Sequence, residues 1–361
     1  MARTQISPLQ FIALFITSFV AVPISILPSA IMTTAGTDSP ASLLIGLFGA
    51  FILMTLIQLC SERLRRKRGH RRGIGYLTFT SLYIFFLLLV MMLTTRNFVE
   101  VVHTYFLLRT PKLVIGLCLL LVAVYGAWYG IVSIARLAHV SFFLTSLAII
   151  SMPLASIPNF RPELLFPLLA EPPEAILSAV VQTIAFCLES FFLLTILPLA
   201  ASTPKQRFKL FSIAYLIGAM IVLIMFGLDF LTFGPYVGGY MVFTSVEFVR
   251  FIGLGEFMER MEIILILVWT IIMTLKVSLA MWIQLVETAL LFRLTDYRVP
   301  AVPVLLISLF GFMLFPQGVV GFYYLTAYWW VIPVVFGAIS FILLHLFAYT
   351  RKKTKKRASP A

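Results

Sequence analysis

Long apolar runs, separated by short polar or charged segments, follow one another along the whole chain. A helix needs about 20 apolar residues to cross the hydrocarbon layer of a bilayer, and ten runs approach or exceed that length. In chain order they are Leu9–Met32, Ala41–Cys60, Tyr76–Leu93 or slightly beyond, Leu113–Ile131, Leu137–Ile157, Ile176–Ala200, Leu210–Phe233, Ile263–Leu290, Val299–Phe315 and Trp329–Tyr349. The pattern predicts an all-α membrane protein of about ten transmembrane helices, with one integral membrane domain over residues 1–349 and a basic cytoplasmic tail over 350–361.

Composition supports lipid as the main solvent. Of the 361 residues, 61% are hydrophobic and 11% are charged, and the mean hydropathy is +1.05. A soluble protein of this length needs more polar surface to cover its core. The net charge of +13 comes from short basic clusters between the runs, where lipid headgroups explain them. We therefore expect a bilayer partner and no nucleic acid.

The basic residues also predict an orientation. If the N-terminus is cytoplasmic and the runs alternate, 20 of the 27 Lys and Arg residues fall in cytoplasmic segments and six fall outside, with Lys276 inside a run. This asymmetry follows the positive-inside rule. We expect a multi-pass protein of the cytoplasmic membrane with both termini in the cytoplasm.

Three ionisable side chains lie inside the predicted spans: Glu189 in the sixth, Asp229 in the seventh and Lys276 in the eighth. An unpaired charge at the centre of a span costs at least about 2.5 kcal/mol. Glu189 and Lys276 are both central, so the cheapest arrangement pairs them or lets each face a wet cavity. Two interpretations stay open, a ligand or ion site between spans six and eight and a structural ion pair.

Spans one and six carry helix-breaking signals. Pro23 and Pro28 lie inside span one, and each removes a backbone N–H and clashes with the preceding turn. Span six ends in Leu197-Pro198. Broken helices five spans apart are typical of transporters built from two inverted five-helix repeats, although a simple proline kink explains span one equally well.

The segment Gly234–Arg260 is the longest predicted external loop, interrupted by Gly238 and Gly239. Its second part, Ser245–Arg260, mixes apolar and charged residues, which indicates a short amphipathic helix on the outer face or an ordinary surface loop.

No motif points to catalysis or to a bound cofactor. The chain has no GxxxxGK[ST] phosphate loop, no HExxH and no GxSxG. The three cysteines, Cys60, Cys118 and Cys187, form no CxxC pair. We expect neither an enzyme nor a metal site.

Several short motifs resemble the B-subunit permeases of bacterial spore-germination nutrient receptors. They are, in order, Thr110-Pro111, Gly130, Ile134-Ala135-Arg136, Leu188-Glu189, Leu197-Pro198, Arg260-Met261-Glu262, Trp269, Lys276 and Ser278. The resemblance covers nearly the whole chain and lies in the order and spacing of the motifs. One departure is that no glycine occurs between Met1 and Ala35, where the superfamily commonly places one; prolines break span one instead.

This resemblance implies a LeuT-like 5+5 inverted repeat with broken helices one and six, in the amino acid–polyamine–organocation superfamily. It implies a sensor of a small-molecule germinant, often an amino acid, in the spore inner membrane. It also implies an A-type membrane subunit and a C-type lipoprotein as partners, and ion release after nutrient binding. The ligand-binding residues that it suggests here are Pro23, Ser25, Ile26, Cys187, Glu189 and Lys276. The alternative function is a conventional secondary transporter of amino acids or related cations.

Overall fold

The structure is a computed structural model. It describes residues 5–65, 74–156, 160–167, 170–251 and 261–316, together with 318, 320–321, 331, 334–339 and 341–343. Within these residues the regular elements are helices only. They are α1 (Pro8–Val20), α2 (Pro23–Ala35), η1 (Gly36–Asp38), α3 (Ser39–Arg65), α4 (Ile74–Tyr105), α5 (Lys112–Tyr129), α6 (Ile131–Ser156), η3 (Pro162–Leu165), α7 (Pro173–Leu188), η4 (Glu189–Thr195), α8 (Leu197–Ala200), α9 (Pro204–Tyr240), α10 (Thr244–Phe251), α11 (Met261–Phe292) and α12 (Ala301–Met313).

These helices confirm an all-α membrane protein. In the described part of the chain, seven helical segments are long and apolar enough to cross a membrane, and shorter apolar helices include α1 and α12. Each of the first nine predicted spans contains a helix. Span one is divided between α1 and α2, and span six between α7, η4 and α8. In the tenth span, residues 334–339 and 341–343 are helical, and the remainder lies outside the described residues, as does the tail at 350–361.

The prediction for span three was too short. The helix α4 continues twelve residues past Leu93, to Tyr105, and Arg96 is fully buried in it instead of lying in a loop. Glu100, one turn further along, forms an ion pair with Arg96 and another with Lys112 at 2.8 Å. This carboxylate offsets the charge of both cations, which allows α4 to continue past Arg96.

The predicted loop after span seven is also mostly helical. The backbone kinks at Gly234, where φ is +73°, and Pro235 restarts the helix, so that Gly238 and Gly239 are helical. Of the expected amphipathic segment Ser245–Arg260, the structure describes α10, whose Phe248 and Val249 are buried and whose Arg250 is exposed. Residues 252–260 lie outside the described residues.

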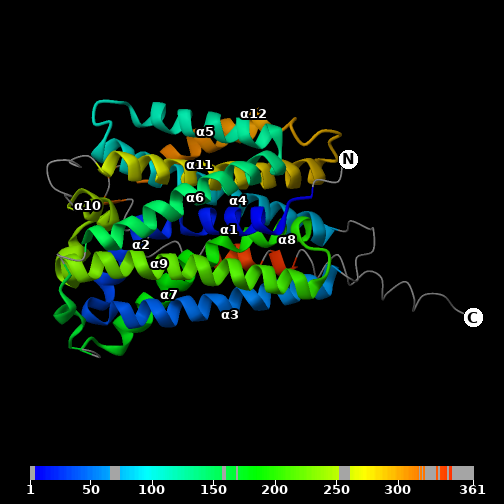
Figure 1. Ribbon diagram of the computed structural model, residues 1–361. Helices are drawn as coiled ribbons and strands as arrows, with labels where there is room; N and C mark the ends of the chain where they lie inside the picture. Colours follow the sequence, from blue (N-terminus) through cyan, green and yellow to red (C-terminus); the bar gives the residue numbers. More distant parts are fainter. Residues whose placement is uncertain are drawn as a thin grey trace, which may run out of the picture.

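The helices run side by side along one direction, with α10 at one end of the bundle and α8 at the other (Figure 1). Span one lies inside: α1 packs against α6, α9 and α11, and α2 packs against α7 and α9. The helices α3 and α7 approach so closely that a Cβ on Gly46 would come within 2.4 Å of the Thr183 side chain, and such small residues let membrane helices pack tightly.

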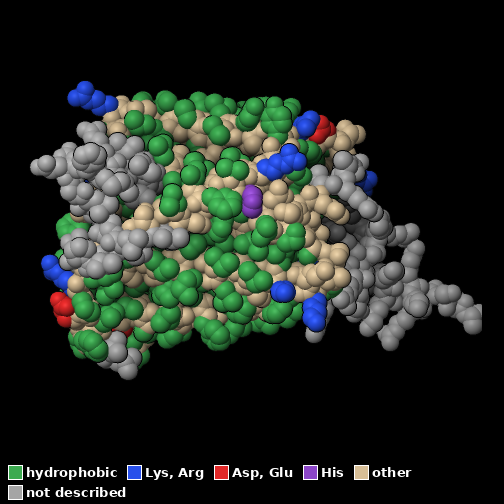
Figure 2. Space-filling model, viewed as in Figure 1, with side chains coloured by type: hydrophobic (Ala, Val, Ile, Leu, Met, Phe, Trp, Pro, Cys, Tyr) green, Lys and Arg blue, Asp and Glu red, His purple; other side chains and the backbone are tan. Residues whose placement is uncertain are grey.

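Apolar side chains cover the flank of the bundle, and charged side chains gather at its two ends (Figure 2). Large exposed apolar residues of the flank include Phe48, Val140, Phe143, Leu216, Met220, Val302 and Phe310. Such a surface would be unstable in water and is suited to lipid. The flank supports a multi-pass membrane protein, whereas the cytoplasmic placement of the termini stays a prediction.

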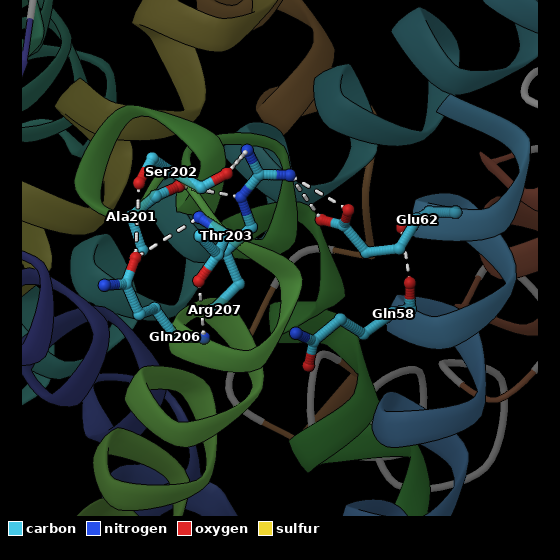
Figure 3. A network of polar contacts seen from close by, with 8 residues as sticks. Gln58, Glu62, Ala201, Ser202, Thr203, Gln206 and Arg207 are labelled. Carbon is cyan, nitrogen blue, oxygen red and sulfur yellow. Dashed lines mark hydrogen bonds and ion pairs between the residues drawn. The ribbon is translucent and has the colours of Figure 1, made fainter. Parts of the chain in front are cut away.

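Arg207 holds together the end of the bundle near α8. Its guanidinium binds the Glu62 carboxylate of α3 at 2.8 and 2.9 Å, and it donates to the carbonyls of Ala201 and Ser202 in the turn after α8 (Figure 3). Thr203 and Gln206 cap the start of α9 in the same network. The second, sixth and seventh predicted spans are therefore tied at this end.

Candidate functional site

Span one is interrupted at Ala21 and Val22, immediately before Pro23. Both residues keep right-handed helical dihedral angles, so the interruption is a kink in the hydrogen-bond ladder and not an extended segment. Pro23 has no N–H with which to continue the ladder. Pro28 remains inside α2 and removes a second donor, the one that would otherwise bond to the Ile24 carbonyl four residues earlier.

The carbonyls freed at this kink are bound by other parts of the chain. The indole Nε1 of Trp269, on α11, donates to the Ala21 carbonyl at 3.0 Å. The Ser245 hydroxyl, at the start of α10, lies 2.7 Å from the Ile24 carbonyl. Since buried carbonyls without partners are costly, these side chains stabilise the kink in its observed form.

Ser25 connects the kink to α4. Its N–H and hydroxyl both donate to the Val22 carbonyl, and Asn97 Nδ2 donates to the Ser25 hydroxyl at 2.7 Å. Ser25 and its neighbour Ile26 are both buried. Residues from α4, α10 and α11 therefore all form hydrogen bonds to span one close to the kink.

A cavity of about 70 Å³ lies beside the kink. Ser25, Ser245 and Trp269 contribute to its lining, which is otherwise apolar. The volume is enough for a few water molecules and too small for an amino acid of ordinary size. Binding of a larger ligand at this position therefore requires the surrounding helices to move.

Span six changes its helical form at Glu189. The α-helix ends at Leu188, and the next seven residues form the 3₁₀ helix η4. Runs of 3₁₀ helix longer than three or four residues are uncommon, and a stretch inside a longer helix often marks a hinge. Pro198, in the following turn, cannot donate to a carbonyl of η4, so span six is weakened at both ends of this stretch.

Glu189 and Lys276 form an ion pair, with Lys276 Nζ at 2.6 Å from Glu189 Oε1. The Lys276 side chain is 0% exposed and the Glu189 side chain 2%. The expected pairing between spans six and eight is therefore present. The buried Cys187 thiol lies close enough to interact electrostatically with both charges.

The predicted site residues fall into two groups. Cys187, Glu189 and Lys276 lie together, whereas Ser25 belongs to the kink in span one. Trp269 connects the groups, because it binds the kink and precedes Lys276 by seven residues of α11. Seven helical residues are two turns, or about 10 Å along the axis. Glu189 and Lys276 do not line the cavity beside the kink.

Asn97 and Ser245 were missed in the sequence because neutral polar residues are common and neither stands out from its neighbours. Asp229 stood out as a charge inside a span but was not connected to span one. In the structure its carboxyl is fully buried and bonded to Ser245. Among the described residues, no group of three His, Cys, Asp or Glu side chains is arranged to hold a metal.

Replacing Trp269 with phenylalanine should destabilise the protein by about 1–3 kcal/mol, because the buried Ala21 carbonyl loses its donor. Thermal unfolding of the detergent-solubilised protein measures this. The matched control is Trp282→Phe on the same helix, since the Trp282 indole has no hydrogen-bond partner within the described part of the chain. Equal effects of the two substitutions would show that ring area, and not the bond to Ala21, matters.

Comparison with known proteins identifies the family of the chain. Residues 5–320 match the family described as spore germination protein, the spore permeases. Spore germination protein XB of Bacillus anthracis is 22% identical over 288 residues, which cover 79% of this chain and 79% of that protein. Putative spore germination protein YfkT of Bacillus subtilis (strain 168) is 23% identical over 277 residues, which cover 76% of this chain and 74% of the relative. The match spans nearly all of the described helices, and the chain therefore belongs to the spore germination protein family of permease-like membrane proteins.

Proposed function

We propose that this chain is the B subunit of a spore germination receptor and senses a small nutrient, most simply an amino acid, near the middle of the membrane. The observation that carries the proposal is the buried Glu189–Lys276 pair, which lies where span six changes its helical form. Buried ionisable groups in membrane spans mark ligand or ion pathways by default.

The charges of this pair complement those of an amino acid. In a rearranged site Lys276 would bind the ligand carboxylate and Glu189 the ligand ammonium group. Each charge would then exchange one partner for another, so neither is left unpaired in the membrane. A ligand with a single charge would leave one member of the pair without a partner, which favours a zwitterion.

The proposed signal is a shift between two arrangements of spans one and six. The kink at Ala21 and the 3₁₀ stretch η4 are the weak points of these spans, and their separation by five spans supports a LeuT-like 5+5 repeat. A ligand that favours one arrangement biases the equilibrium toward it. In this proposal an A-type membrane subunit and a C-type lipoprotein receive that bias in the spore inner membrane, and ion release follows.

Deletion of the gene in its host tests the role. Purified spores are exposed to a panel of amino acids and sugars, and loss of refractility is scored together with vegetative uptake of each nutrient. The receptor proposal predicts that one nutrient response disappears while uptake is unchanged. Intact germination with reduced uptake would instead identify a secondary transporter.

A charge exchange tests the site. Glu189→Lys combined with Lys276→Glu keeps an ion pair but reverses the order of its charges, so the protein should fold and fail to respond to the nutrient. Glu174→Gln, an exposed carboxylate in the first turn of α7, is the control that should respond normally. A normal response by the exchanged variant would show that the pair is structural and does not bind ligand.

A further inference from the structure

Asp229 is a buried acid that has no counter-charge among the described residues. Its side chain, on α9, is 0% exposed, and no ion pair with it occurs among the described residues. One carboxyl oxygen, Oδ2, is bonded to the Ser245 hydroxyl, and the other, Oδ1, has no hydrogen-bond partner in the described part of the chain. An ionised carboxylate in this position would be very costly.

The geometry around Ser245 specifies the protonation state of Asp229. The Ser245 hydroxyl oxygen lies within hydrogen-bond distance of both the Ile24 carbonyl and Asp229 Oδ2. A carbonyl and a carboxylate are both acceptors, and a serine hydroxyl carries one proton. Two oxygens in contact without a proton between them repel each other. Both contacts are satisfied only when Asp229 carries a proton and donates it to Ser245, which in turn donates to Ile24.

The ionisable groups of the neighbouring elements do not supply a positive charge that could neutralise Asp229 in place of this proton. The helices α1 and α2 have no ionisable side chain, and the nearest basic residue earlier on α9, Lys209, precedes Asp229 by 20 residues, about 30 Å along the helix. Some of the other groups on elements packed against α9 have partners of their own: Glu247 and Arg250 of α10 pair with each other, Asp38 of η1 binds the Glu171 N–H, and Glu62 of α3 binds Arg207. The remaining ionisable residues of these elements and of α9 itself are Glu163 of η3, Cys60, Arg63 and Arg65 of α3, Arg136 and His139 of α6, and Lys205, Tyr215, Tyr236 and Tyr240 of α9.

We propose that Asp229 is a proton-binding site that controls the kink in span one. The protonated acid holds Ser245 in the orientation that binds the Ile24 carbonyl, the acceptor that Pro28 leaves free. When the proton leaves to water, the Ser245 proton turns to the new carboxylate and the Ile24 carbonyl loses its donor. Loss of one proton therefore loosens α2 at the kink.

The small cavity beside the kink gives this proton a route. Ser245 lines it, together with Met225, which lies one turn before Asp229 on α9. A cavity of about 70 Å³ admits water when polar partners are available, and Ser25 and Ser245 provide them. The proposed site is separate from the Glu189–Lys276 pair and does not depend on the identity of the germinant.

Infrared spectroscopy of the full chain in lipid nanodiscs tests the protonation. The chain has only three aspartates, Asp38, Asp229 and Asp296, so isotopic labelling of aspartate isolates few bands. We expect a carboxylic-acid carbonyl band at neutral pH that shifts with the label and disappears in Asp229→Asn. Asp296→Asn, on an exposed loop, should remove only a carboxylate band. A carboxylate band lost from Asp229→Asn at neutral pH would overturn the proposal.

Trp269 reports the coupling, because its indole binds the kink. In a variant with Trp128, Trp282, Trp329 and Trp330 changed to phenylalanine, raising the pH should shift the Trp269 emission in a single transition. Asp229→Asn, whose amide can donate to Ser245 as the neutral acid does, should abolish the transition and still fold. A transition that persists in Asp229→Asn, or that follows added Na⁺ at constant pH, would overturn the proposal.

Discussion

Replacing Lys276 with methionine is expected to destabilise the protein by about 3–5 kcal/mol, the largest effect that we expect from a single substitution near the site. Glu189, whose side chain is 2% exposed, would lose its partner at 2.6 Å. Removing one member of a buried ion pair is strongly destabilising for this reason. The measurement is thermal unfolding of the purified protein in detergent, together with its yield from the membrane.

The double variant Glu189→Gln, Lys276→Met is the control. It removes both charges, so it should recover much of the stability that the single substitution loses, because a neutral pair has no uncompensated charge. Its nutrient response should remain absent if the pair binds ligand. If Lys276→Met unfolds at the same temperature as the unmodified protein, the charges are not buried against each other as described.

Replacing Glu100 with glutamine should have an effect of similar size, about 3–5 kcal/mol. Arg96, which is fully buried, and Lys112 both bind this carboxylate. Without it, two cations remain close together inside the bundle. Arg96 also donates to the Pro316 carbonyl at 3.1 Å, so the loss should loosen the segment after α12. Thermal unfolding of the solubilised protein again provides the measurement.

Lys112→Met is the variant with which Glu100→Gln should be compared. The Lys112 side chain is 19% exposed, and its removal leaves the Arg96–Glu100 pair intact, so its effect should be nearer 1 kcal/mol. The exposed pair between Glu247 and Arg250 should matter still less, and Glu247→Gln tests that. If Glu100→Gln is no more harmful than Lys112→Met, Arg96 does not depend on this carboxylate.

Span one illustrates how a local signal leads to a local prediction. Proline cannot donate a backbone hydrogen bond wherever it occurs, so Pro23 and Pro28 indicated a kink before any neighbour was known. The position was accurate to about two residues, at Ala21 and Val22. The partners of the freed carbonyls were not predictable, because Trp269 and Ser245 follow Ala21 by more than 200 residues.

The predicted end of span three was wrong for the opposite reason: it depended on contacts distant in the sequence. The apolar run was expected to end near Leu93, which left Arg96 in a segment outside the membrane. The structure continues the helix because the Glu100 carboxylate forms ion pairs with both Arg96 and Lys112. A pair one turn apart can be suspected from spacing, but the arrival of Lys112 from α5 depends on how the two helices pack.

The sequence by itself determined the all-α membrane fold, the order of nine described spans and the kink in span one. It also determined the pairing of Glu189 with Lys276, because an unpaired charge in the membrane is costly. These follow from run length, from proline chemistry and from the energy of a charge in lipid, and each is a property of a short segment or of its solvent. Only the tertiary structure decided which side chains fill the gaps in the hydrogen-bond ladder, and that Asp229 shares Ser245 with Ile24. Such contacts depend on which helix faces lie together in the bundle, and residue spacing along one chain does not specify that.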